Sequence, residues 1–353
     1  MMVVDCANKY LQGYGFKEGF NMKHRLGFWL LTFANISFEG LGEVSRLGEE
    51  LGYDRVYTTE SLTDTLAINQ LMATYTSKIE IGSSVAIIYL RHASMAAQGA
   101  VAINEISGGR YILGLGLGHP PRIRAMGIEP GNPLEDMRKY MCEVKGVLEG
   151  EPVYPLPVQT YQGEELKFRR TNYPVRIYIA AVGPKMTELG GEIADGLLPY
   201  MVPLSRMSAY LESRDRGAIR AGRDPRDVEI DLGIHTFLCD DLAFAREAAR
   251  QTLTYWLGLP AYNNSIRESG YEQEAESIKR AFESGDQKAL RDGITDAIID
   301  EFCLVGPPER CRERLAAFLE AGVDMPALMI DPVLAGESYQ DAVERTLKAL
   351  APR

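Results

Sequence analysis

The 353-residue sequence has few residues of the kinds that hold metals or build disulfide frameworks. Its five cysteines are scattered and form no CxxC pair, so we expect reduced thiols in an intracellular, cytoplasmic protein. Among its four histidines, no two lie three or four residues apart. Because the usual zinc sites need such spacings, we expect no metal site.

Long apolar runs and an excess of basic residues are also missing. No run approaches roughly 18 apolar residues, which predicts no membrane span, and the amino terminus lacks the apolar stretch of a secretory signal. Lys and Arg number 38 against 49 Asp and Glu, a formal net charge of −11. This balance argues against nucleic acid and anionic membranes as partners, but not against a local basic pocket for a small anionic ligand.

Short β-rich segments alternate with helical segments along almost the whole chain. Such alternation produces parallel βαβ units. A doubly wound sheet and a closed barrel both fit the pattern, but about eight strand segments without a linker favour a (β/α)8 TIM barrel. We therefore predict an α/β protein with an amino-terminal extension, residues 1–24, and a single barrel domain, residues 25–353.

Two segments interrupt the alternation. Residues 151–175 indicate an inserted loop with a hairpin around Gly163, and residues 258–300 are polar and helical. Long insertions in a barrel usually cover its active end, so we expect these loops at the C-terminal face of the strands. For the second insertion, a surface or oligomer-contact excursion is an equal alternative.

The stretch GLGLG, with Gly114, Gly116 and Gly118, raises the question of a dinucleotide fingerprint. That fingerprint needs GxGxxG on a first strand, with the third glycine opening a helix. Here the third position is His119, and the two prolines after it, with fixed φ and no N–H, are expected to prevent immediate helix entry. The stretch therefore indicates a fourth barrel strand, on which small residues such as Gly116 let a flat ligand approach the backbone.

Four stretches carry a family resemblance. ISGGRYILGLG, residues 106–116, resembles the LSxGRxxLGxGxG motif of the bacterial luciferase-like flavin and deazaflavin enzymes. Residues 81–93, 177–196 and 294–323 are similar to the branch with methylenetetrahydromethanopterin reductase and other enzymes that use the deazaflavin coenzyme F420. The resemblance implies a luciferase-like TIM barrel that binds coenzyme F420, or alternatively FMN, across the carboxyl ends of its strands.

Cofactor contacts are predicted at two of these stretches. In AAVGPKM, a strand end meets a helix start, where free N–H groups and a glycine favour phosphate binding, although an ordinary turn would look similar. In IGSSVA, the resemblance implies a non-prolyl cis peptide, Ser84–Val85, behind the ring; a plain strand is the alternative. The predicted cofactor-binding residues are Ser84, Val85, Ala86, Gly116, Ala181, Val182, Gly183, Pro184 and Lys185.

The candidate catalytic residues are Glu60 and His119. Relatives often carry Asp-His or Glu-His at the end of the second strand, where this chain has Glu60 and Ser61. Because a serine is no general acid near neutral pH, the proton must come from elsewhere. His119 replaces the Glu or Asp of relatives and could protonate a substrate. A solvent-exposed acid and a structural histidine are the alternative interpretations.

Together these features favour an F420-dependent oxidoreductase that moves hydride to or from a small organic substrate, such as a carbonyl, imine or activated alkene. The main alternative is a two-component FMN monooxygenase, which receives reduced flavin from a reductase partner and consumes oxygen. A barrel that only stores a flavin is a third possibility. Relatives usually form dimers, so we expect a homodimer.

Overall fold

Eight parallel strands close into a ring in the computed structural model, which describes residues 25–150 and 159–352. The predicted extension, residues 1–24, lies outside the described residues. The ring runs β1-β2-β3-β5-β8-β9-β10-β12, and β12 pairs with β1. Its strands are β1 (Gly27–Leu30), β2 (Arg55–Thr58), β3 (Glu80–Ser83), β5 (Tyr111–Gly116), β8 (Arg176–Ala180), β9 (Gly196–Leu198), β10 (Glu229–Leu238) and β12 (Met325–Ile330). The predicted (β/α)8 barrel is confirmed.

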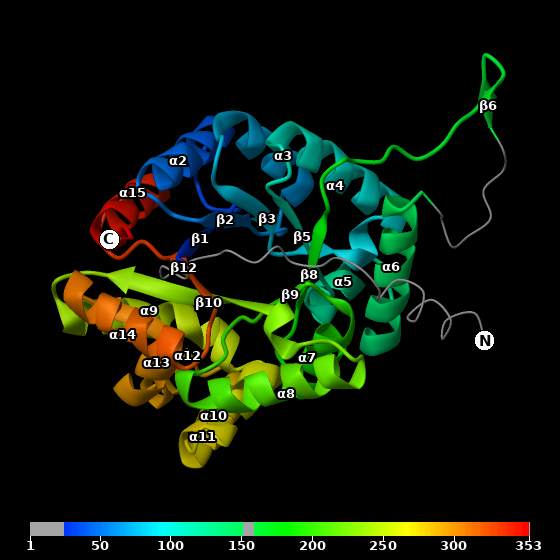
Figure 1. The fold of residues 1–353 in the computed structure, drawn as a ribbon. Coiled ribbons are helices and arrows are strands. Elements are labelled where there is room, and N and C mark those ends of the chain that lie inside the picture. Colours follow the sequence, from blue (N-terminus) through cyan, green and yellow to red (C-terminus); the bar gives the residue numbers. More distant parts are fainter. Residues whose placement is uncertain (1–24, 151–158, 353) are drawn as a thin grey trace.

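Helices surround this ring on all sides (Figure 1). The outer layer contains α2 (Phe38–Glu50), α3 (Thr65–Tyr75), α4 (Ala93–Ser107), α6 (Pro133–Leu148), α7 (Pro184–Ile193), α8 (Met207–Arg220), α9 (Leu242–Leu257), α14 (Pro308–Glu320) and α15 (Tyr339–Leu350). Further helices are α5 (Pro120–Ala125), α10 (Pro260–Glu268), α11 (Glu272–Ser284), α12 (Gln287–Gly293) and α13 (Asp296–Phe302). Two short strands, β4 (Ala86–Ile87) and β11 (Cys303–Gly306), pair with β5 and β10.

Alternation along β1 decides what lies inside the barrel. Phe28 points outward and packs edge-on against Tyr53, with ring centroids 5.3 Å apart. Trp29 points inward and joins a small interior core that includes Tyr57 and Tyr178. Successive strand residues face opposite sides, so one short strand serves both the outer core and the barrel interior.

A buried ionic network fills the amino end of the barrel. Arg55 is fully buried, and its guanidinium contacts Asp231, Glu229 and Glu80, with Nε 2.9 Å from Glu80 Oε2. Burial alone would raise the pKa of Glu80, but Arg55 and the neighbouring arginines hold that pKa at about 2. Removing one partner of this network should strongly lower the stability of the fold, because a buried charge without its partner is destabilising.

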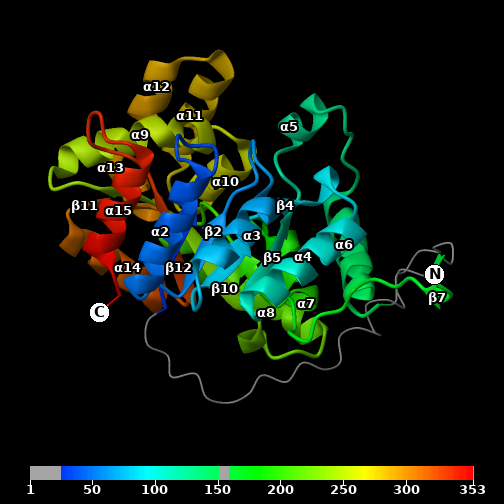
Figure 2. The same cartoon turned by 90° about the horizontal axis from the view of Figure 1, so that it is seen from above.

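The two insertions lie at different ends of the barrel. The first contains the predicted hairpin, with β6 (Thr160–Tyr161) pairing β7 (Glu164–Glu165), and it stands away from the barrel in Figure 1. It joins α6 to the amino end of β8, so it does not cover the carboxyl ends as expected. The second insertion, α10–α12, lies at the same end as α5 (Figure 2), which follows the carboxyl end of β5.

One sequence argument about helix entry is wrong. The helix α5 begins directly at Pro120, with prolines in its first two positions and His119 as its N-cap residue. Prolines are tolerated there because the first helical N–H groups have no partner within the helix. The dinucleotide reading still fails, because β5 is a barrel strand in a closed ring and not the first strand of an open sheet.

The cysteines differ in part from expectation. Cys239, Cys303 and Cys311 are free thiols, whereas Cys142 is disulfide-bonded, so the expectation of reduced cysteines fails at that residue. Within residues 25–150 and 159–352, no cluster of metal-binding side chains occurs. The same part of the chain has no helix with the length and apolarity needed to cross a membrane.

Glu49 joins the end of α2 to the segment before β3, and this contact predicts a pH-dependent stability. Its carboxylate accepts hydrogen bonds from the backbone N–H groups of Ser77 (2.8 Å) and Ile79 (2.9 Å). Partial burial raises its pKa, but these bonds outweigh burial and lower the pKa from 4.5 to about 2. The stabilisation is therefore complete above pH 4.5 and disappears as pH falls towards 2.

We expect Glu49→Gln to lower the free energy of unfolding at pH 7, because the charged acceptor of these backbone hydrogen bonds is lost. The loss should be only about 1 kcal/mol, because partial exposure screens the charge. Urea denaturation at pH 7 and pH 3 measures the effect, and the difference from wild type should shrink at pH 3. The neighbouring Glu50→Gln is the matched control. Glu50 is exposed, and its ion pair with Arg46 is a long surface pair of 3.9 Å that should contribute little. Equal effects of the two substitutions would contradict this role of Glu49.

Candidate active site

The third strand carries a bulge at its carboxyl end. Gly82 pairs with Ile112 of β5, and Ala86 pairs with Leu115. Three residues, 83–85, therefore lie opposite two residues of β5, 113–114, so the first segment has one extra residue. The Ser83 hydroxyl bridges the gap, because it donates to the Gly114 carbonyl and accepts from the Gly114 N–H, both at 2.9 Å. The peptide between Ser84 and Val85 is cis, as the resemblance implied.

The glycines of β5 are needed by this bulge. A Cβ on Gly114 would lie 1.9 Å from the Ser83 carbonyl oxygen, and one on Gly116 would lie 2.3 Å from Val85 Cγ2. The space that a side chain on either glycine would fill is therefore already occupied by protein atoms. The expectation that they make room for a flat ligand is replaced by a packing reason: they let the bulge at Ser84, Val85 and Ala86 lie against the fourth strand.

A second glycine region is open. The strand β8 ends at Ala180, Ala181 and Val182 follow it, and α7 begins at Pro184 with Gly183 as its N-cap residue. No side chain caps this helix, and a Cβ on Gly183 would meet no atom within 4 Å. Gly183, Pro184 and Lys185 are exposed. Uncapped N–H groups, the positive helix end and a lysine are the features that favour a phosphate.

Glu60 lies at the same rim but is held on both oxygens. Its carboxylate forms a salt bridge with Arg91, one of whose contacts is 3.0 Å, and accepts a 2.5 Å hydrogen bond from the Ile87 N–H. The nearby carboxylate raises the pKa of Arg91 despite the opposing effect of burial. Because both carboxylate oxygens are held by the Arg91 guanidinium and one also by the Ile87 N–H, this arrangement fits positioning of the loop after β4.

His119 lies beside α5 and is partly buried. Burial and the nearby Arg122 lower the pKa of its imidazole, which favours the neutral form. Its ring lies 5.4 Å from that of Trp256 on α9. Arg122 also donates a 3.0 Å hydrogen bond to the hydroxyl of Ser61. Ser61 and His119 therefore lie on the same side of the rim, and Arg122 is close to both.

Sequence reasoning missed a hydrogen-bonded chain at this rim. Tyr200 follows β9, His235 lies in β10, and Asp331 follows β12. The Tyr200 hydroxyl is 2.6 Å from His235 Nε2, and His235 Nδ1 is 2.6 Å from Asp331 Oδ2. Alternation along β10 contained a usable signal, because Asp231, Gly233 and His235 share the face that points into the barrel.

Aromatic rings enclose Tyr200. It stacks on Trp29, with centroids 5.9 Å apart, and meets Trp256 and Tyr262 edge-on at 5.1 Å and 5.9 Å. Gly233 makes room for Trp29, because a Cβ there would lie 2.7 Å from the indole ring. Since Trp256 also contacts His119, the aromatic group connects the two sides of the rim, and the second insertion contributes Tyr262 to it.

Several buried polar atoms near the strand ends have no hydrogen-bond partner among the described residues. They are Trp29 Nε1, Thr59 Oγ1 and Arg122 Nη2. Such groups are rare in folded proteins because losing water without a new partner is unfavourable. Two donors and a hydroxyl at the rim, together with the open helix start at Gly183, fit a polar, phosphate-bearing ring system as ligand.

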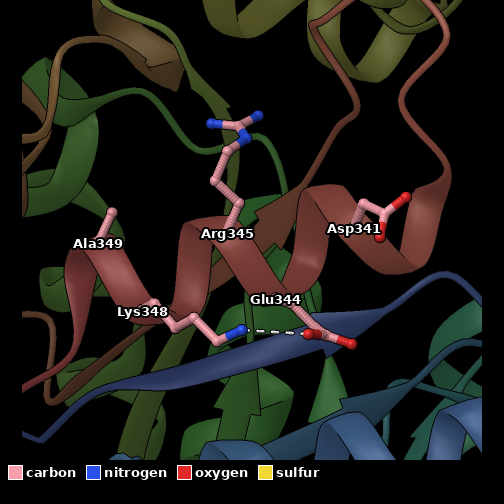
Figure 3. Close-up of a pocket in the computed structure, with 5 residues that line it drawn as sticks. All are labelled: Asp341, Glu344, Arg345, Lys348 and Ala349. Atoms are coloured by element: carbon pink, nitrogen blue, oxygen red, sulfur yellow. Dashed lines mark hydrogen bonds and ion pairs between the residues drawn. The ribbon is translucent and has the colours of Figure 1, made fainter.

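Figure 3 shows another hollow, an open depression lined by Asp341, Glu344, Arg345, Lys348 and Ala349. All of its lining residues belong to α15, and Lys348 pairs with Glu344 at 3.2 Å. No strand end contributes to it, so it is a surface feature between charged side chains and not a candidate active site.

The closed ring, with polar and aromatic side chains gathered at the carboxyl ends of its strands, defines a (β/α)8 barrel of the kind that places its active site at this end. Within this class, the model of the luciferase-like monooxygenase family matches residues 22–325. The chain therefore belongs to this family of oxidoreductases.

Similar proteins include reductases and a monooxygenase. The 5,10-methylenetetrahydromethanopterin reductase of Methanolobus tindarius is 31% identical over 320 residues, which cover 88% of this chain and 94% of that protein. The coenzyme F420 dependent tetrahydromethanopterin reductase from Methanopyrus kandleri has a TM-score of 0.76 at 22% identity, over 94% of this chain and 98% of its own. The FMN complex of a Baeyer–Villiger monooxygenase from Pseudomonas putida has a TM-score of 0.61 at 16% identity, over 94% and 99%. Both structures show the fold alone.

Proposed function

We propose that this protein is an F420-dependent oxidoreductase that transfers hydride to or from a small organic substrate at the barrel rim. The observation that carries the proposal is the pair of cofactor features at one rim: the bulge at Ser84–Val85 and the open helix start at Gly183. The similarity to a putative coenzyme F420-dependent oxidoreductase of Mycobacterium tuberculosis, 28% identical over 88% of this chain, supports the choice of F420 over FMN.

The residues of the chain have separate roles in this proposal. Ser84, Val85 and Ala86 support the ring system, and Gly116 lets them lie against β5. The N–H groups at the start of α7 bind the phosphate, assisted by Lys185, while Ala181 and Val182 line its approach. When bound, the cofactor supplies a hydride donor or acceptor carbon. The protein orients the substrate, excludes water and moves one proton.

Binding of two cofactors tests the choice between the two chemistries. The purified protein is titrated with F420 and with FMN, each oxidised and reduced, and oxygen consumption is followed with the reduced forms. We expect F420 to bind and the complex to consume no oxygen. Tight FMN binding without F420 binding, accompanied by oxygen consumption, would instead establish the monooxygenase alternative.

The phosphate position is tested by Lys185→Glu. Reversing the charge should weaken F420 binding about tenfold or more, because a charge-assisted hydrogen bond to phosphate is lost and repulsion is added. Lys348→Glu on α15 is the matched control, since Lys348 is an exposed lysine outside the rim. If both variants bound F420 as the wild type does, the phosphate would not lie at α7.

A further inference from the structure

The hydrogen-bonded chain at the rim has no role in the assignments above. We propose that Asp331, His235 and Tyr200 form the proton relay of the site, with the Tyr200 hydroxyl as the group that meets the substrate. The inference rests on the proposed function, and it defines the substrate class: the carbon that accepts hydride is double-bonded to oxygen or nitrogen, and that heteroatom takes the proton.

The direction of the relay follows from its hydrogen bonds. An ionised carboxylate only accepts, so His235 must carry a proton on Nδ1 to meet Asp331 Oδ2 at 2.6 Å. This leaves Nε2 facing the Tyr200 hydroxyl at 2.6 Å. Nε2 can then accept the hydroxyl proton when the imidazole is neutral, or donate one when it is protonated. The chain can therefore pass a proton in either direction.

Tyr200 and Asp331 are the two ends of this chain, with His235 between them, and the proposal places the substrate at the Tyr200 end. Asp331 is 9% exposed and His235 is 3% exposed, whereas Tyr200 is partly exposed. A buried carboxylate and imidazole at hydrogen-bonding distance hold charge in a medium where it is otherwise unfavourable. Trp29 and Trp256 pack against the Tyr200 ring and fix its position. These are properties of a positioned relay and not of a surface network.

The other candidates for proton transfer are less suited to it. Glu60 is held by Arg91 and by the Ile87 N–H, and Ser61 is bound by Arg122. Burial and Arg122 lower the pKa of His119, which therefore carries no spare proton near neutral pH. Burial raises the pKa of Tyr200 well above its usual value, so its hydroxyl stays protonated between turnovers.

In the proposed reduction, a C=O or C=N carbon would accept the hydride that reduced F420 supplies when bound, and the π electrons of the double bond would move to the heteroatom. The heteroatom takes the Tyr200 proton, while the Tyr200 oxygen takes the Nε2 proton of the His235 imidazolium. Tyr200 ends neutral, His235 ends as neutral imidazole on the Asp331 carboxylate, and solvent returns the missing proton. Oxidation of an alcohol or amine runs the same steps backwards.

Three substitutions separate the relay from a structural role. Tyr200→Phe removes only the hydroxyl, and Asp331→Asn removes the charge that orients His235. Asp324→Asn is the matched control, because Asp324 precedes β12 whereas Asp331 follows it. Asp324 accepts a 2.8 Å hydrogen bond from the Ile230 N–H, far along the strand from the rim.

The first measurement uses nitrogen-15 NMR of the histidine rings in the cofactor-free protein, with His235 assigned from His235→Gln. We expect a slowly exchanging Nδ1 proton in wild type and in Tyr200→Phe, lost in Asp331→Asn and kept in Asp324→Asn. Tyr200→Phe should shift the Nε2 resonance alone. An Nδ1 proton that survives in Asp331→Asn would overturn the relay.

The second measurement follows F420 binding and turnover with reduced F420 and three probes: acetone, benzaldehyde and methylenetetrahydromethanopterin. We expect Tyr200→Phe to bind F420 normally and to lower kcat by about 100-fold or more, with KM unchanged and a diminished solvent deuterium isotope effect. Asp324→Asn should keep the wild-type kcat. A protein that binds F420 but reduces none of the probes, or a Tyr200→Phe variant with wild-type kcat, would overturn the inference. Failure to bind F420 would overturn the proposed function itself.

Discussion

Replacing Arg55 by methionine is expected to lower the free energy of unfolding by about 3–5 kcal/mol. Arg55 is fully buried among Asp231, Glu229 and Glu80, and it is the cation that all of these carboxylates share. Methionine keeps much of the side-chain volume but removes the charge. The carboxylates then repel one another inside the barrel, or must take up protons, and either outcome costs stability.

Urea denaturation at pH 7 measures this effect. Arg124→Met is the matched control, because Arg124 forms an exposed pair with Glu129 at 3.1 Å. Exposed pairs contribute little, so the control should change stability by at most about 0.5 kcal/mol. A loss below about 1 kcal/mol for Arg55→Met would mean that the network does not stabilise the base of the barrel.

Adding one methyl group at Gly114 is expected to disrupt the bulge that we assign to ring binding. In Gly114→Ala the new Cβ would lie 1.9 Å from the Ser83 carbonyl oxygen and 2.6 Å from Leu198 Cδ1. The first neighbour is backbone, so β3 and β5 must separate. We expect a loss of about 1–3 kcal/mol in stability and at least about tenfold weaker F420 binding, because the support at Ser84–Val85 moves.

Denaturation and F420 titration of the same samples distinguish the two effects. Gly99→Ala provides the control, since Gly99 lies inside α4 and a Cβ there would meet only the flexible Leu66 side chain, at 3.1 Å. Helix propensity favours alanine at such a position by about 0.5–1 kcal/mol, so this variant should fold and bind normally. A Gly114→Ala variant with wild-type stability and binding would show that the close approach of the strands is not required.

Much of the barrel could be predicted because its signals are local. Each strand is a short apolar run, and each helix repeats apolar residues at helical spacing, with caps such as Ser37, which accepts a hydrogen bond from Gly40. The hairpin around Gly163 and the cis peptide at Ser84–Val85 were also expected, the latter from the resemblance alone. Periodicity and motif position carry this information without knowledge of distant contacts.

The ionic network and the relay could not be predicted because their members meet only after ring closure. Arg55 and Asp231 are separated by 176 residues, and His235 and Asp331 by 96. A charged residue in a strand has no local feature that identifies its partner. The helix after His119 could not be predicted for another reason: prolines usually break helices, but the first helical turn accepts them, and Pro120 and Pro121 occupy that turn.

A crystal structure of the protein grown with oxidised F420 tests the central claim most directly. The account predicts the tricyclic ring against the bulge at Ser84–Val85, the phosphate at the N–H groups that open α7 beside Lys185, and the Tyr200 hydroxyl facing the substrate side of the ring. A cofactor bound away from the carboxyl ends of the strands, or a phosphate held elsewhere than the start of α7, would contradict it.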